Sequence, residues 1–181
     1  MHVRFSTCRG QEVTVDHTQE RLGSVLEPLI DPDTGTIEGF FVDVPQGLGQ
    51  QSQFISALDI VHWGTHVAVN DHHAVAPAED IIRLQPLLSD PRTVLWQPLR
   101  TEGGRRLGRC CDVQFNSESM QCEWLFPRRW WRWGMPIPFS EIVEVRPDAI
   151  IVKDIAVTEP METIMLDDTE VVTDTASEVP E

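Results

Sequence analysis

The sequence predicts a mainly β protein in which two tandem small β-barrels are joined by a short helical connector and followed by a disordered acidic C-terminal tail. Three observations predict this fold: an internal repeat, strand-length segments in which apolar and polar residues alternate, and a charge that is uneven along the chain. We place the first barrel at residues 1–74, the connector at 75–91, the second barrel at 92–157 and the tail at 158–181.

An internal repeat of about 65–70 residues is the strongest of these signals. The tripeptide Arg21-Leu22-Gly23 returns as Arg106-Leu107-Gly108, 85 positions later. The order of the matching segments is preserved, and the offset changes only in loop-like places, which indicates a duplication. The other matching segments are 11–13 with 97–99, 38–41 with 123–126, 59–61 with 141–143 and 67–71 with 150–154.

Each copy is predicted to consist of β-strands. In the second copy Leu107, Arg109, Cys111, Val113 and Phe115 share one parity, the period of two that is typical of a half-buried strand. Short strands are also expected at residues 37–44, 60–61, 67–69, 142–145 and 149–152. Short strands at this spacing close most easily into a small barrel, which removes exposed edges.

A turn in the first copy has a clear chemical basis. In the segment 31–35, Pro32 fixes φ, Asp31 can hydrogen-bond to its own backbone, and Gly35 accepts a positive φ. This segment therefore predicts a hairpin turn between two strands.

The connector between the copies has helical features. Pro77 lies near its start, the acidic residues Glu79 and Asp80 follow, and Ile81, Leu84 and Leu88 have helical spacing. We expect one or two helical turns.

Charge divides the chain into three unlike parts. The 181 residues carry a formal net charge of −15, which resolves into −9 over residues 1–91, +2 over 92–157 and −8 over 158–181. The acidic total argues against a surface that binds polyanions throughout. The last segment has no Lys, Arg or aromatic residue and cannot bury much, so we expect it to be disordered.

Neither membrane insertion nor a bound metal is expected. No apolar run approaches the roughly 18–20 residues of a membrane span, and the N-terminus lacks the apolar stretch of a secretory signal. Cys8, Cys110, Cys111 and Cys122 lack the paired spacing of a zinc site and are predicted to be reduced structural thiols. These features predict a soluble cytoplasmic protein without a cofactor.

Three motifs resemble those of the PRC-barrel family. They are the strand at residues 106–113 (RLGRCCDV), the hairpin at 30–39 (IDPDTGTIEG) and the strand at 137–142 (IPFSEI). The resemblance covers residues 8–71 and 93–154. It implies small β-barrels of the kind found in the cytoplasmic part of the photosynthetic reaction-centre H subunit, in ribosome maturation factors of the RimM type, and in stand-alone prokaryotic proteins. It implies protein–protein docking and supplies no catalytic residues.

The most unusual stretch of the chain is rich in arginine and tryptophan. Residues 126–134 contain three Trp and three Arg, whereas the aligned residues 42–50 are polar and rich in Gly and Gln. Arg and Trp are enriched at interface hot spots, and they can also stack on and neutralise single-stranded nucleic acid. The predicted partner-binding residues are Arg128, Arg129, Trp130, Trp131, Arg132 and Trp133.

A structural role is the alternative for this stretch. Trp131 and Trp133, which share a parity, would then cover the barrel end or the seam between barrels, and Arg129 or Arg132 would cover them by cation–π stacking. Three fully exposed Trp side chains would favour aggregation. Both interpretations stay open on the sequence.

The resemblance and the Arg/Trp stretch predict a non-enzymatic protein–protein adaptor or assembly module that docks through this stretch. No Ser–His–Asp or Cys–His arrangement, P-loop or HExxH motif points to an enzyme. Two alternatives are an RNA- or ribosome-assembly-associated factor and a peripheral factor of a photosynthetic or other membrane complex. The acidic tail is further expected to lie on the Arg/Trp stretch, or on the arginine-rich second barrel, when no partner is bound.

Overall fold

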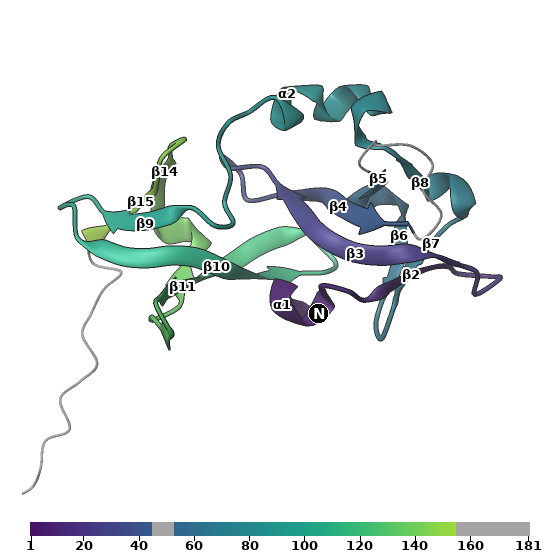
Figure 1. The fold of residues 1–181 in the computed structure, drawn as a ribbon, viewed down its shortest axis with the longest axis horizontal. Coiled ribbons are helices and arrows are strands. Elements are labelled where there is room, and N and C mark those ends of the chain that lie inside the picture. The colour runs from purple at the N-terminus through teal and green to yellow at the C-terminus, as the bar shows by residue number, and fades with distance from the viewer. Residues whose placement is uncertain (45–52, 155–181) are drawn as a thin grey trace, which may run out of the picture.

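The computed structural model describes residues 1–44 and 53–154, and these residues form a mainly β fold, as predicted. Two sheets lie side by side along the long axis of the molecule (Figure 1). One is built from the first half of the chain, and the other from the second half together with the N-terminal strand. No helix in the described part of the chain is long and apolar enough to cross a membrane.

The first sheet has the strand order β6-β7-β2-β3-β4-β5-β8. All neighbours in it are antiparallel except β2 and β7, which are parallel. Its strands are β2 (Glu12–Val15), β3 (Arg21–Ile30), β4 (Ile37–Asp43), β5 (Gln53–Ser56), β6 (Ile60–Trp63), β7 (Val67–Val69) and β8 (Val75–Pro77).

The second sheet has the order β12-β11-β10-β9-β15-β14, with β1 also paired to β10 and β13 to β11. Over the described residues both sheets are open, because the two end strands of each sheet are not paired with each other. The strands are β1 (His2–Arg4), β9 (Pro98–Thr101), β10 (Arg106–Asn116), β11 (Gln121–Arg129), β12 (Arg132–Trp133), β13 (Ile137–Pro138), β14 (Ile142–Val145) and β15 (Ile150–Val152).

Strand pairing supports the internal duplication in detail. The parallel pair β2–β7 places Val13 opposite Val67, and the parallel pair β9–β15 places Leu99 opposite Ile150. The repeat aligns Val13 with Leu99 and Val67 with Ile150. Both long hairpins also carry a β-bulge at the same place, between residues 25 and 27 in β3 and between 110 and 112 in β10.

The bulge in β10 corrects the predicted parity of this strand. Cys110, Val113 and Phe115 are buried, whereas Arg109 is exposed and Cys111 is half-buried. An extra residue at the bulge moves the inward face from even to odd positions. The single parity predicted for residues 107–115 is therefore wrong on the N-terminal side of Asp112.

Close approach of the paired strands explains the repeated Arg-Leu-Gly tripeptide. A Cβ atom on Gly23 would lie 2.5 Å from the Asp43 carbonyl oxygen, and one on Gly108 would lie 2.6 Å from the Arg128 carbonyl oxygen. Only glycine fits between the strands at these two equivalent positions.

The two copies contact each other through equivalent residues. The hairpin turn after β3 meets the turn after β10, where Ile37 N donates to Met120 O at 2.7 Å and Cys122 N donates to Gly35 O at 2.9 Å. Gly35 and Met120 are equivalent in the repeat, and both have a positive φ, 73° and 51°. The halves are thus arranged about an approximate two-fold axis through these turns.

One hydrophobic core spans both halves. The ring of Phe115 from the second copy lies 5.8 Å from that of Phe40 and 5.4 Å from that of Trp63, both from the first copy. The core cluster also contains Cys8, Leu95, Cys122 and Leu125. Burying this apolar surface stabilises the two sheets together.

The connector contains the predicted helical turns and one strand that was not predicted. After β8, 3-10 turns at Ala78–Asp80 and Ile82–Leu84 lead into α2 (Gln85–Leu88). Leu84 is buried and Ile81 and Leu88 pack against the same small cluster, in agreement with their spacing. Strand β8 follows the turn at residues 72–74, pairs with β5 and extends the first sheet.

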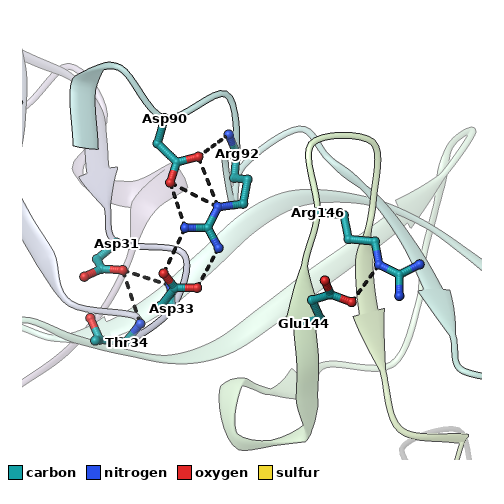
Figure 2. Close-up of polar contacts among 7 residues, drawn as sticks. All are labelled: Asp31, Asp33, Thr34, Asp90, Arg92, Glu144 and Arg146. Atoms are coloured by element: carbon teal, nitrogen blue, oxygen red, sulfur yellow. Dashed lines mark hydrogen bonds and ion pairs between the residues drawn. The ribbon is translucent and has the colours of Figure 1, made fainter. Parts of the chain in front are cut away.

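An arginine fastens the connector to the first hairpin turn (Figure 2). The Arg92 guanidinium binds Asp33 at 2.6 Å and Asp90 at 2.7 Å. These hydrogen bonds lower the pKa values of both carboxyl groups and raise that of Arg92. The turn forms as predicted, with Asp31 accepting a hydrogen bond from the backbone N–H of Asp33 at 2.8 Å.

Candidate partner-binding surface

The six predicted partner-binding residues form a short β-hairpin at the end of the second sheet. Strands β11 and β12 pair Arg128 with Trp133 and Arg129 with Arg132, which leaves Trp130 and Trp131 as the two-residue turn. We call residues 128–133 the Arg/Trp hairpin. Its base is held by a hydrogen bond of 2.8 Å from Gly134 N to Pro127 O.

All three tryptophans of this hairpin face solvent. Trp130, Trp131 and Trp133 are 80%, 73% and 53% exposed. The Trp130 and Trp131 rings meet edge to face, with centroids 6.0 Å apart. Among the described residues the rings therefore cover neither a barrel end nor a seam, unlike the arrangement that the structural alternative expects.

The turn is also unusual in its backbone. Trp130 has φ = 58°, a conformation that hairpin turns normally assign to Asn or Gly. A bulky residue there costs about 1 kcal/mol or more. Neither this conformation nor the exposure of the rings helps the chain to fold.

Cation–π contacts at the base of the hairpin involve other arginines than predicted. The Arg128 guanidinium carbon lies 5.3 Å from the centroid of Trp133, and that of Arg4 lies 5.6 Å from the same ring and 4.0 Å from Phe126. The proposed stacking of Arg129 or Arg132 is wrong in this respect, because their cross-strand pairing places both at the outer end of the hairpin.

Arg4 is fixed by a buried carboxylate. Asp112 is fully buried in β10 and accepts hydrogen bonds from Arg4 Nε at 2.9 Å, Ser6 N at 2.9 Å and Ser6 Oγ at 2.6 Å. Arg4 ends β1, and Ser6 lies in α1 (Phe5–Cys8), so the N-terminal segment of the first copy supports the hairpin of the second.

A groove of about 280 Å³ lies beside the Arg/Trp hairpin. We call it the basic groove. Apolar contacts come from Trp133, Met135 and Ile137, and the charge comes from four arginines that have no ion pair among the described residues. The groove is lined by Arg105, Arg106, Leu107, Pro127, Arg129, Arg132, Trp133, Gly134, Met135 and Ile137.

Arginines face arginines across three strand pairs at this end of the sheet. The directly opposed residues are Arg129 and Arg132, Arg109 and Arg128, and Arg100 and Arg106. Like charges directly opposite each other destabilise a sheet. The equivalent positions in the first copy pair Ser24 with Asp43 and Thr14 with Arg21, so the repeat itself does not require this arrangement.

The sequence indicated the Arg/Trp stretch, as a loop, but neither its hairpin form nor the groove beside it. Arg4 lies more than 100 residues from its partner Asp112, and no local pattern indicated that they meet. Arg105 and Arg106 follow Gly103-Gly104, and their proximity to Arg129 depends on the pairing of β9, β10 and β11. Once the strand pairing is known, a search for like charges at directly opposed positions reveals this cluster of arginines.

The cysteines are free thiols, three of them buried. Burial raises the pKa of Cys8 and of Cys122 to about 12 and that of Cys110 well above its ordinary value. Burial also raises the pKa of the half-buried Cys111, although Arg128 and Arg109 act in the opposite direction. High thiol pKa values disfavour the nucleophilic thiolate.

Metal-binding geometry is absent from the described residues, where no three His, Cys, Asp or Glu side chains gather as metal ligands. His72 and His73 are exposed, with ring centroids 3.9 Å apart. The tail and most of the loop aligned with the Arg/Trp stretch, residues 45–50, lie outside the described residues.

Comparison with known proteins finds no matching family model and no matching curated protein.

Proposed function

We propose that this protein is a non-enzymatic protein–protein adaptor or assembly module that docks its partner through the Arg/Trp hairpin. The observation that carries the proposal is the exposure of Trp130, Trp131 and Trp133 on a hairpin with a hydrogen-bonded base. Desolvating exposed aromatic rings yields binding free energy, and a preformed hairpin loses little conformational entropy when it binds.

We further propose that the two curled sheets are PRC-like barrels and that the protein acts in the cytoplasm. The motifs at residues 30–39, 106–113 and 137–142 support this assignment. The repeated bulges and registers agree with two copies of one small β fold.

Tagged full-length protein tests the docking role by affinity purification from its native host, compared with a Trp130→Ala, Trp131→Ala variant. Proteins captured by the native chain should be lost with this variant. A matched control, Leu58→Ala with Ile82→Ala, removes side chains that are 79% and 86% exposed in the first half, and it should capture the same proteins. Equal capture by both variants would contradict the proposal.

A second candidate function is RNA binding in ribosome assembly, which the opposed arginine pairs favour. Its test is co-sedimentation with small ribosomal subunits. Arg128→Ala, Arg129→Ala and Arg132→Ala together should abolish co-sedimentation. Co-sedimentation of the native chain should fall steeply as the salt concentration rises.

A further inference from the structure

We infer that the basic groove is a binding site for an acidic peptide segment and that its occupant is the C-terminal segment of this chain, residues 158–181. The inference rests on the proposed function only because the acidic segment and the proposed partner would use the same surface. The groove would then hold an internal competitor of the partner.

The charge of the basic groove favours an acidic occupant. Arg105, Arg106, Arg129 and Arg132 line one groove without a carboxylate partner among the described residues, and Arg129 directly opposes Arg132. Such an arrangement is destabilising by itself and is relieved by an anion that bridges the pair. Arginine binds carboxylates through two parallel hydrogen bonds, so a peptide with several carboxylates fits the groove.

The composition of residues 158–181 matches this requirement. Eight Asp and Glu residues occur there with no Lys or Arg. The apolar run Ile164-Met165-Leu166 directly precedes Asp167-Asp168. The groove has the complementary composition, because Trp133, Met135 and Ile137 adjoin its arginines.

The described chain also ends beside the groove. Asp154, the last described residue, accepts a hydrogen bond from Gly103 N at 3.1 Å in the turn between β9 and β10. Arg105 and Arg106 follow this turn directly and line the groove. Ile164 lies ten positions after Asp154, which at roughly 3.3 Å per extended residue is a reach of about 33 Å. An intramolecular contact of this kind benefits from a high effective concentration.

Indole N–H resonances of the full chain test the contact without any partner. Neutralising the acidic segment should shift the signal of Trp133, which lines the groove, and added salt should move the native signal the same way. The buried Trp63 is an internal reference. The neutralised variant carries Asp167→Asn, Asp168→Asn and Glu170→Gln, and the matched control with the same charge change carries Glu20→Gln, Glu79→Gln and Asp80→Asn.

A synthetic peptide of residues 158–181 then tests the site itself. It contains no tryptophan, so its binding to the neutralised full chain is followed by tryptophan fluorescence. Arg129→Gln with Arg132→Gln should weaken binding about two- to five-fold for each arginine removed. The matched pair Arg9→Gln and Arg21→Gln, both exposed and in the first half, should leave binding unchanged.

Several results would overturn the inference. Indole signals that do not respond to the neutralised acids, or a peptide that binds the arginine variant as well as the native groove, would each exclude it. Shifts that grow with protein concentration would assign the segment to a second copy. Binding of a single-stranded RNA 12-mer without binding of the peptide would assign the groove to nucleic acid. None of these results changes partner capture by the Trp variants, which separately decides the proposed function.

Discussion

Thr36 and Gln121 occupy the same position in the two copies of the repeat, and they face each other in an antiparallel β-bridge. The Gln121 side-chain amide also donates to Thr36 Oγ1 at 2.7 Å. A contact between equivalent residues is the mark of an isologous interface. The single chain is therefore built as two-fold dimers are, with both protomers in one polypeptide.

Replacing Gly108 with alanine should destabilise the protein by about 2–3 kcal/mol, because a Cβ would collide with the Arg128 carbonyl oxygen and the residue has φ = 125°. Gly23→Ala meets an equivalent collision without a left-handed backbone and should cost less. Urea denaturation followed by far-ultraviolet circular dichroism measures both. Equal stability of Gly108→Ala and the native chain would contradict the close approach of β10 to β11.

Asp112→Ala should lower the free energy of unfolding by about 3 kcal/mol, since it removes the buried acceptor of Arg4 and Ser6. Asp112→Asn keeps the shape and should cost less. In both variants Arg4 should release Trp133, so acrylamide quenching of tryptophan fluorescence should increase. Unchanged quenching in a folded variant would mean that Arg4 does not support the hairpin.

Acid should remove the stabilisation that Arg92 provides. The pKa values of Asp33 and Asp90 lie below the ordinary value of 3.8 in the folded protein, so their stabilisation is present above that value. It is lost as the pH falls through their lowered pKa values. Arg92→Gln should therefore lower the urea midpoint at pH 7 and have a smaller effect at pH 2–3.

A second ion-paired arginine offers the control for this experiment. Arg146 pairs with Glu144 at 2.7 Å on the exposed surface (Figure 2). Exposed pairs contribute little to stability. Arg146→Gln should leave the midpoint nearly unchanged at both pH values, and a loss as large as that of Arg92→Gln would show that the effect is not specific to the connector.

Alkylation should distinguish the four cysteines. Cys111 is the only one of them that is not buried, and the pKa values of Cys8 and Cys122 are raised to about 12. Iodoacetamide at pH 8 should modify Cys111 first in the folded protein, and all four in urea. Mass spectrometry of tryptic peptides measures the order. Rapid modification of Cys8 in the folded chain would contradict its burial.

The repeat allowed the sequence to predict which strands are equivalent, because strand register preserves sequence offsets. Val13 with Leu99 and Val67 with Ile150 were aligned in this way, and they occupy matching places in the two sheets. The turn at residues 31–35 could also be predicted, because it depends only on residues within it. Asp31 accepts a hydrogen bond from the backbone of the turn, and Gly35 adopts a positive φ.

Contacts between distant segments could not be predicted in the same way. A bulge at Cys110–Asp112 inverts parity without any local signal in the residues that flank it. The proximity of Arg105 to Arg129 depends on three strands, and that of Arg4 to Trp133 depends on the N-terminal strand crossing to the other copy. The exposure of Trp130 and Trp131 likewise follows from where β11 ends and β12 begins, which leaves them in the turn.

The approximate two-fold arrangement has a consequence for stoichiometry. Two separate, identical protomers would display two identical hairpins and could bridge two partners. Here residues 42–50, which align with the Arg/Trp stretch, contain neither Trp nor Arg. Fusion of the copies has let one loop diverge without the other, so each molecule carries a single Arg/Trp hairpin. If the proposed docking role holds, each chain offers its partner one such hairpin, the arrangement of a cap rather than of a cross-linker.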